Sequence, residues 1–290
     1  MNIIVFGGSG FLGSHVADKL SEQGHAVTIF DLKKSEYLRP DQKMVVGDIK
    51  KISDITGAIK GNEIVYNFSA IADLDDARKK PLETAEVNII GNLHILENCK
   101  INNVKRYIFA STVYVYSRSG SFYKCSKKAA EDYIQEYQKK FDTDYTILRY
   151  GSLYGPRSNL SNGLTKIIYD SIKNKKVIYR GSPETMREYI HVEDAAISSV
   201  EAMNDSFKNQ SINLKGKDTM RVYDLLKVLS EILGYKEEEI EFKTYEHPDH
   251  YVRTPYSYEP KLGRNYTPNL NIDMGQGLLE LIQEVQKKFL

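Results

Sequence analysis

A phenol and an ammonium group lie four positions apart in the segment from Tyr123 to Lys127. A helix over this segment would bring both groups to one face. A free tyrosine has a pKa of about 10, and an ammonium about 4 Å away at an effective dielectric of about 20 contributes on the order of 4 kcal/mol, enough to bring that pKa near 7. Thr112 offers a hydroxyl just upstream. These residues predict a catalytic site in which Tyr123 removes a hydroxyl proton, Lys127 makes Tyr123 basic and Thr112 orients the substrate hydroxyl.

Three glycines near the N-terminus indicate what accompanies this proton transfer. Gly7, Gly10 and Gly13 stand between an apolar run of strand character and a helical pattern. Glycines at this spacing allow a tight turn, close approach of the backbone to a pyrophosphate and close packing of helix on strand. The anion is then held at the helix N-terminus. The pattern predicts a dinucleotide-binding turn, to which Phe11 and Leu12 contribute as the first residues of the helix.

An acidic residue closes the next predicted strand. Asp31 follows an apolar run that begins at Ala26. A carboxylate at this point accepts hydrogen bonds from the ribose hydroxyls and repels a 2′-phosphate, which favours NAD over NADP. Lys33 and Lys34 follow closely and leave some room for the phosphorylated cofactor. An oxidised nicotinamide beside Tyr123 would add to the positive charge that lowers the pKa of the phenol.

Composition excludes several classes of function. Across 290 residues, 40 Lys and Arg balance 39 Asp and Glu, so no basic surface predicts a nucleic acid or an anionic membrane as partner. No apolar run approaches the length of a membrane span, and the N-terminus is interpreted as the first core strand rather than a signal peptide. Cys99 and Cys125 are too few for a disulfide framework or a thiolate metal site, so we expect no metal and a cytoplasmic location.

Strand-like and helical patterns alternate through the first half of the chain. Strands are predicted at residues 2–6, 26–30, 43–46, 63–68, 106–111 and 145–149, and helices at 11–23, 53–59, 82–102 and 123–141. Such alternation predicts an α/β fold of the Rossmann type, a doubly wound parallel sheet with helices on both faces. Ligands bind beyond the carboxyl ends of the strands in such sheets, and each motif above falls at such an end.

The second half of the chain is less regular. Helices are predicted at residues 164–173, 222–233 and 277–289, with a late strand at 211–214. We therefore predict an NAD-binding domain over residues 1–150, joined by a helix near 192–203 and by the late strand. Residues 151–290 are predicted to form mainly a smaller, mixed α/β substrate-binding lobe.

Taken together, these residues resemble the extended short-chain dehydrogenase/reductase family, in its NAD-dependent nucleotide-sugar epimerase/dehydratase branch. The resemblance covers nearly the whole chain. Besides the glycine turn, Asp31 and the Tyr123–Lys127 pair, it rests on residues 47–49, 67–70, 88–92, 111–112, 149–157 and 187–194.

The resemblance implies further cofactor contacts. Asp48 and Ile49 would border the adenine, Ala70 would line the cofactor groove, and Asn88 would also bind the cofactor. Lys127 would touch the nicotinamide ribose. A turn cap for Asp48 and a purely structural role for Asn88 are the alternatives.

The resemblance also implies a nucleotide-diphosphate sugar as substrate. Arg187 would contact the diphosphate, which suits a bidentate guanidinium. Thr112, Ser152 and Arg253 complete the expected substrate-binding set. We interpret His191 as a hydrogen-bonded structural residue, and Asp194 as a helix cap rather than a ligand.

The family resemblance further implies a homodimer. Helices 82–102 and 123–141 carry apolar stripes, part of which must cover the sheet. The remainder would pair with its copy in a four-helix interface. The alternative is a monomer that uses both stripes in its own core.

Two positions after Thr112 exclude some reactions of the branch. Members that eliminate water carry an Asp-Glu pair there, whereas this chain has Val113 and Tyr114. These two side chains do not supply the acid and base that remove a C5 proton and a C6 hydroxyl, so 4,6-dehydration is not expected. The Glu of decarboxylating members and the Cys of 3,5-epimerising members are missing from the same positions. Hydride and proton transfer at one carbinol remains.

Several outcomes of that chemistry stay open. If the keto sugar takes hydride back on its other face, the enzyme is a 4-epimerase; if the keto sugar leaves, the enzyme is a 4-dehydrogenase or 4-ketoreductase. Reduction of a small carbonyl compound and a non-catalytic NAD-sensing role are the remaining alternatives. The short loop 117–122 and Ser152, where the family often has Asn, indicate an atypical sugar pocket.

Overall fold

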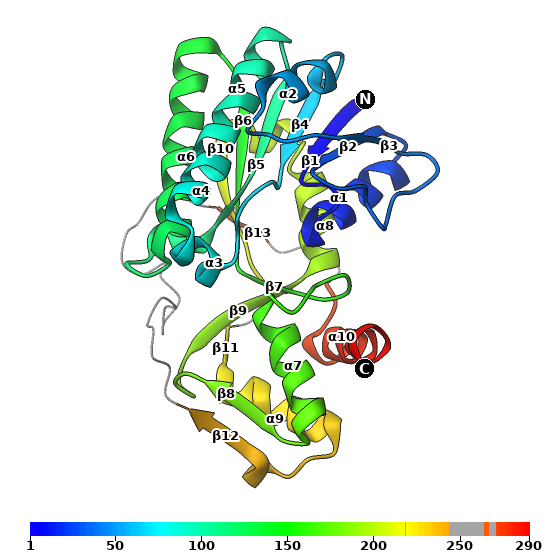
Figure 1. Cartoon of the computed structure of the whole chain (residues 1–290), viewed down its shortest axis with the longest axis vertical. Helices are drawn as coiled ribbons and strands as arrows, with labels where there is room; N and C mark the ends of the chain where they lie inside the picture. Colours follow the sequence, from blue (N-terminus) through cyan, green and yellow to red (C-terminus); the bar gives the residue numbers. More distant parts are fainter. Residues whose placement is uncertain (218, 244–263, 267–270) are drawn as a thin grey trace.

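An eight-stranded parallel sheet forms the centre of the computed structural model, which describes residues 1–217, 219–243, 264–266 and 271–290. Its strands lie in the order β13, β10, β6, β5, β4, β1, β2, β3 (Figure 1). They are β1 (Asn2–Phe6), β2 (Ala26–Asp31), β3 (Lys43–Val46), β4 (Ile64–Asn67), β5 (Arg106–Thr112), β6 (Tyr145–Tyr150), β10 (Gln210–Leu214) and β13 (Arg264–Tyr266). The predicted Rossmann-type class is therefore confirmed.

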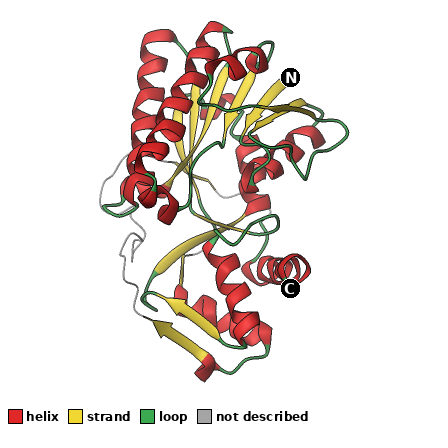
Figure 2. Cartoon of the chain, viewed as in Figure 1, coloured by secondary structure: helices red, strands yellow, loops and turns green. Residues whose placement is uncertain are grey.

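Each face of the sheet has its own apolar core because successive strand residues point to opposite sides. In β1, Ile3 and Val5 belong to one core, and Ile4 and Phe6 to the other. Helices cover both faces (Figure 2). The first core includes residues of α1 (Phe11–Glu22) and α8 (Val192–Glu201); the second includes residues of α2 (Ile52–Ile59), α5 (Asn92–Ile101) and α6 (Ser121–Phe141).

The winding of the sheet reverses between β1 and β4. These strands pair directly, although β2 and β3 come between them in the chain. The chain therefore leaves these two strands in opposite directions, and the region beyond their carboxyl ends is the usual ligand site of such sheets. The glycine turn follows β1, and Phe68 and Ser69 follow β4.

A smaller lobe lies beyond these carboxyl ends (Figures 1 and 2). It contains one sheet of β11, β9 and β7 and another of β12 and β8, with a separate apolar core around Tyr154 and Leu226. Its elements are β7 (Ser152–Tyr154), α7 (Gly163–Asn174), β8 (Val177–Arg180), β9 (Met186–His191), β11 (Thr219–Arg221), α9 (Val222–Leu233), β12 (Ile240–Lys243) and α10 (Met274–Phe289).

One predicted helix differs from expectation. The segment predicted as one helix over residues 82–102 consists of α4 (Pro81–Ala85), a π-helical stretch η1 (Glu86–Gly91) and α5. A side chain on Gly91 would come within 2.7 Å of Ile49, so glycine lets this stretch approach the loop after β3. Helix α3 (Leu74–Lys79) and the short strands of the smaller lobe were not predicted, because segments of three to six residues show too little periodicity.

Candidate active site

The three predicted catalytic residues come from two adjoining elements. Thr112 ends β5, while Tyr123 and Lys127 occupy the first two turns of α6. The side chains of Thr112 and Tyr123 share a hydrogen bond. The structure thus brings both hydroxyls together at the carboxyl end of the sheet, where a single carbinol can contact both.

Lys127 lies one helical turn beyond Tyr123 on α6 and is buried. It is 2% exposed, its ammonium donates to the carbonyl of Ala110 at 2.7 Å, and it stands 4.6 Å from the centroid of the Phe109 ring. Burial lowers the pKa of Lys127 to about 7, and the nearby charge of Glu131 opposes this effect. Contacts with β5 therefore hold the ammonium in a buried position, where Lys127 loses its proton more easily than it would in water.

The expected basic phenol is not found in the chain alone. Burial raises the pKa of Tyr123 to about 12, and the hydrogen bond with Thr112 opposes the rise only in part. The argument from spacing was wrong here because it counted the ammonium but not the loss of water around both groups. Desolvation of the phenol therefore outweighs its hydrogen bond with Thr112.

The start of α6 depends on a glycine. Gly120, which precedes the helix, has φ +109°, and a side chain there would come within 2.7 Å of the Tyr114 ring and 2.8 Å of Lys124. A residue with a side chain would be strained in this conformation. The short loop therefore turns sharply over Tyr114 and begins the helix in time to bring Tyr123 to Thr112.

The glycine turn has the geometry that a dinucleotide requires. A side chain on Gly13 would come within 2.2 Å of the carbonyl oxygen of Gly7, so α1 packs directly on the turn. Gly10 is the N-cap of α1 and makes no side-chain cap, and the first turn, with Phe11 and Leu12, contains no acidic residue. The first amide groups of a helix lack partners within it. This end of α1 therefore suits a pyrophosphate.

Asp31 lies beside the same turn. Its carboxylate accepts the backbone N–H of Ser9 at 3.0 Å and that of Leu32 at 2.7 Å. Burial raises its pKa above the usual range, although these hydrogen bonds oppose the rise. The strand end and the glycine turn are thus joined through the carboxylate that was predicted to bind ribose.

The remaining predicted cofactor residues differ in what their side chains contact. Asp48 accepts the N–H of Lys50 at 2.9 Å, as a turn cap does, and buried Ile49 packs against Gly91. Ala70 is partly exposed just after β4.

Asn88 acts as a clamp between two loops of the site. Its amide group accepts the N–H of Ile71 at 2.8 Å and donates to the carbonyl of Ile71 at 3.0 Å and to the hydroxyl of Ser126 at 2.9 Å. Ser126 lies between Tyr123 and Lys127 on α6. These contacts match the structural alternative for Asn88, and its binding of the cofactor stays a prediction.

Two of the predicted substrate residues, Ser152 and Arg187, lie on the smaller lobe, and a third, Thr112, ends β5. Ser152 begins β7 and pairs in register with Tyr189 of β9. Arg187, also on β9, is 7% exposed and donates to the carbonyl of Met186 at 3.0 Å. Arg253 falls outside the described residues.

Two neighbouring residues, His191 and Asp194, have local structural partners. His191 is the N-cap of α8 and accepts the N–H of Glu193 at 3.4 Å, which matches its predicted structural role. Asp194 is not the cap; it accepts the N–H of Ile272 at 3.0 Å, and burial raises its pKa to about 6. A cavity of about 210 Å³ opens beside these two residues, lined also by Tyr154, Lys215 and Met274, and Thr112 and Tyr123 are not in its lining.

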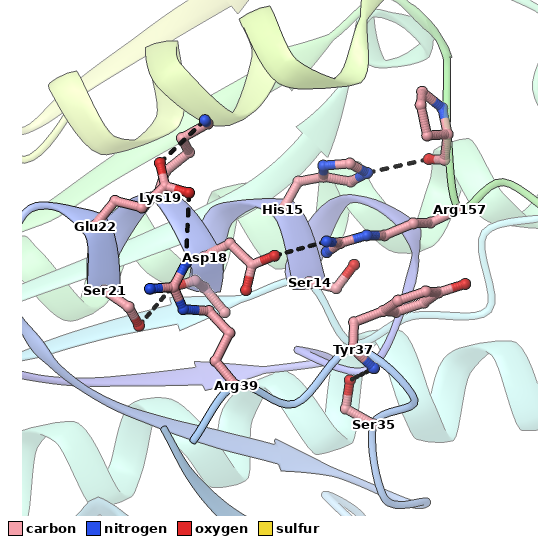
Figure 3. A network of polar contacts seen from close by, with 12 residues as sticks. Ser14, His15, Asp18, Lys19, Ser21, Glu22, Ser35, Tyr37, Arg39 and Arg157 are labelled. Carbon is pink, nitrogen blue, oxygen red and sulfur yellow. Dashed lines mark hydrogen bonds and ion pairs between the residues drawn. The ribbon is translucent and has the colours of Figure 1, made fainter. Parts of the chain in front are cut away.

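Sequence reasoning missed a polar network that joins the two lobes at α1 (Figure 3). His15 lies 2.6 Å from Glu193 of α8 and 3.1 Å from the carbonyl of Pro156. Asp18, one turn further along α1, pairs with Arg157 at 2.7 Å. The helix that begins at the glycine turn is therefore fastened to the segment after β7. Polar residues spaced three apart on an otherwise buried helix were the available signal.

A second missed network is formed by Glu131 of α6 and Arg149 of β6. They are 4% and 3% exposed and are joined at 2.6 Å. A charged residue inside an apolar strand and a carboxylate one turn beyond Lys127 were visible in the sequence, but only their packing makes them partners.

The described residues contain neither a metal site nor a membrane-spanning helix. No group of three or more His, Cys, Asp or Glu side chains in the described part of the chain could hold a metal ion. Within the same residues, each helix is too short or too polar to span a membrane.

Comparison with known proteins accounts for this arrangement. A model of the NAD dependent epimerase/dehydratase family matches residues 3–214. A putative UDP-glucose 4-epimerase of Methanocaldococcus jannaschii is 30% identical, with 82% of this chain and 84% of that protein covered. The UDP-glucose 4-epimerase of Thermotoga maritima, solved with UDP-glucose, is 26% identical with a TM-score of 0.86 over 100% of both chains. That of Thermus thermophilus, solved with NAD, is 22% identical with a TM-score of 0.82 over 99% of this chain and 100% of the other. The chain is thus an enzyme of the NAD-dependent epimerase/dehydratase family.

Proposed function

We propose that the protein is an NAD-dependent nucleotide-sugar 4-epimerase. The observation that carries the proposal is the contact between Thr112 and Tyr123 above buried Lys127, with no carboxylate at the two positions that follow Thr112. The similarity to 4-epimerases supports it. The proposed substrate hydroxyl is the one on C4 of the sugar.

Each catalytic residue has one task in this proposal. Thr112 donates to and orients the sugar hydroxyl, and Tyr123 removes its proton and later returns it. Lys127 provides the positive charge that stabilises the phenolate. NAD, when bound, supplies the acceptor and donor of hydride. Burial raises the pKa of Tyr123 to about 12, so the positive charge of Lys127, together with that of bound NAD, would have to offset this burial for Tyr123 to act as a base.

The residues proposed to hold NAD surround the region beyond the carboxyl ends of β1 and β4. The N-terminus of α1 suits the pyrophosphate, and Asp31 suits the ribose hydroxyls. Ile49 and Ala70 are proposed to line the adenine side and the groove. On the smaller lobe, Arg187 is proposed to bind the substrate diphosphate, with Ser152 nearer the sugar.

The side chains after Thr112 favour epimerisation over elimination. Val113 is 1% exposed, and Tyr114 packs beneath Gly120. They do not form the pair of carboxyl groups that would act on C5 and on the C6 hydroxyl of a sugar. The proposed reaction is therefore confined to hydride and proton transfer at C4.

We also propose that two copies associate through α6 and η1. Leu96, Ala130 and Ile134 are used in the core of the same chain, whereas Ile90 and Tyr133 are 46% and 47% exposed. An exposed apolar face of this kind is typical of an interface. Sedimentation equilibrium should give twice the mass of the chain; a monomer at micromolar concentration would contradict the proposal.

A panel of UDP-, GDP-, dTDP- and CDP-sugars tests the activity. The purified protein loaded with NAD should isomerise at least one of them without accumulation of reduced nicotinamide absorbance. Tyr123→Phe should lower kcat ~10²–10⁴-fold, because it removes the proton transfer and keeps the ring. Calorimetry should show nearly unchanged binding of NAD by this variant. Net formation of NADH, or substantial activity of Tyr123→Phe, would contradict the proposal.

A further inference from the structure

A buried polar network runs beneath the catalytic residues and connects the elements that carry them. The carboxylate of Glu131 is bidentate on Arg149, with Nη2–Oε2 at 2.6 Å and Nε–Oε1 at 3.0 Å. Ser111 donates its hydroxyl to the same carboxylate. Arg149 also donates to the hydroxyl of Tyr116, which in turn donates to Asn213 at 3.0 Å.

Ser111 and Glu131 lie close to proposed catalytic residues in their own elements, and Arg149 joins these elements to β6. Ser111 precedes Thr112 on β5, and Tyr116 ends η2 (Val113–Tyr116), which follows Thr112. Glu131 lies one turn beyond Lys127 on α6. Arg149 lies directly opposite Ser111 in the pairing of β5 with β6.

Taking these two charges out of water is costly, so stability of the fold does not by itself explain why they are buried. An ion pair taken out of water often contributes no more than well-packed apolar side chains would. Here the pair spans from helix α6 to strand β6 and holds Ser111 between them. Such a brace fixes how far the helix that carries Tyr123 stands from the strand that carries Thr112.

We propose that Glu131 and Arg149 are positioning residues, which set the spacing of Tyr123 from Thr112 and keep Lys127 positively charged. This inference rests on the proposed function, because it assigns the pair a task in the same proton transfer. Ser111 and Tyr116 act with the pair as its anchors on β5 and η2.

The charges that face Lys127 support the second task. Glu131 is on its own helix, and its charge favours the protonated form of Lys127. Arg149 from β6 faces Glu131 and neutralises part of that charge. From β5 come the carbonyl of Ala110 and the ring of Phe109, both of which attract the ammonium without being charged. Glu131 is thus the anionic group that offsets burial of Lys127.

The variant Glu131→Gln distinguishes the effect of the negative charge of this side chain from the effect of its size. The amide keeps the length of the side chain and an acceptor for Ser111, but it loses the negative charge. We expect kcat to fall ~10-fold or more, with KM for the nucleotide sugar within about threefold, and the rising limb of the kcat–pH profile to move to higher pH. Ser111→Ala keeps the charge and loosens the brace, so kcat should fall a few-fold without movement of the limb.

Asp205→Asn is a control for the loss of a carboxylate that pairs with a buried arginine. Asp205, whose side chain is 94% exposed, pairs at 2.9 Å with buried Arg106 at the opposite end of β5. The same change from carboxylate to amide there should leave kcat and its pH profile as in the wild type. If Glu131→Gln behaves like this control, the pair is only structural and the inference is wrong.

Two further measurements test the inference even if Glu131→Gln does not fold or if no nucleotide sugar is turned over. Should Glu131→Gln fail to fold, wild-type kcat in both Ser111→Ala and Tyr116→Phe would overturn the inference. With NAD bound and no sugar present, the phenolate absorbance of Tyr123, taken as the difference from Tyr123→Phe, should titrate at higher pH in Glu131→Gln. This result stands even if no nucleotide sugar is turned over, whereas an active Tyr123→Phe would contradict the proposed function itself.

Discussion

The cofactor-binding half and the smaller lobe position their functional residues in different ways. In the first, register between neighbouring parallel strands fixes the glycine turn, Asp31 and Thr112 at one edge of a single eight-stranded sheet. In the second, Ser152 and Arg187 stand in a separate three-stranded sheet. Under the proposed roles of these residues, the type of reaction depends on the regular half and the choice of substrate on the smaller lobe.

The largest effect is expected from a substitution that disturbs only the half that is proposed to bind the cofactor. Gly13→Ala would place a methyl group within 2.2 Å of the carbonyl of Gly7, so α1 must move away from the turn. We expect NAD binding to weaken ~10²-fold or more, because the helix N-terminus leaves the pyrophosphate. Calorimetry with NAD measures this. Gly57→Ala, within α2, should bind NAD normally because open space surrounds that position and its backbone accepts a side chain; equal binding by both variants would contradict the assignment.

A smaller effect is expected when the substrate lobe is altered. Arg187→Ala should raise KM for a nucleotide sugar ~10-fold or more, since a hydrogen bond from a charged donor is worth about 1.5–3 kcal/mol. NAD binding should stay unchanged, because Arg187 belongs to β9. Steady-state kinetics with a nucleotide sugar and with a small ketone show whether Arg187 binds the diphosphate. An equal rise of KM for both substrates would refute diphosphate binding.

The contact between α1 and α8, the helix that returns from the smaller lobe to the sheet, should produce the smallest effect, in stability. The hydrogen bond with His15 is the largest of the influences that lower the pKa of Glu193 to about 2. A depressed carboxylate pKa stabilises the fold above pH ~4.5, and this contribution is lost as the pH falls from ~4.5 toward ~2. Because Glu193 is 30% exposed, we expect about 1–2 kcal/mol.

Glu193→Gln tests this connection. Urea unfolding from pH 7 down to pH 3 should show that the variant is less stable than the wild type at neutral pH and loses less stability on acidification. Glu22→Gln is the control, because Glu22 lies on α1 with 46% exposure and pairs with Lys19 at the surface. Parallel curves for Glu193→Gln and the wild type would contradict a contribution from the contact between α1 and α8.

Much of the regular half was predictable because its signals are local. A strand that leads into spaced glycines and a tyrosine four residues before a lysine need only one or two turns of chain to be interpreted. The π-helical stretch around Asn88 was not predictable, since it depends on contacts with Ile71 and Ser126 from other elements. Predictions for Arg253 and for the exact division of the chain at residue 150 remain predictions.

By itself, the sequence determined the nucleotide-binding turn, the Tyr123–Lys127 pair and the absence of acidic residues after Thr112, because each depends on residue type and short spacing. Only the tertiary structure decided that the ammonium of Lys127 rests on the carbonyl of Ala110, that Glu131 pairs with Arg149 and that α1 fastens the two lobes together. The physical reason is that spacing fixes neighbours within a helical turn. Loss of water around a charge depends on all the elements that close over it.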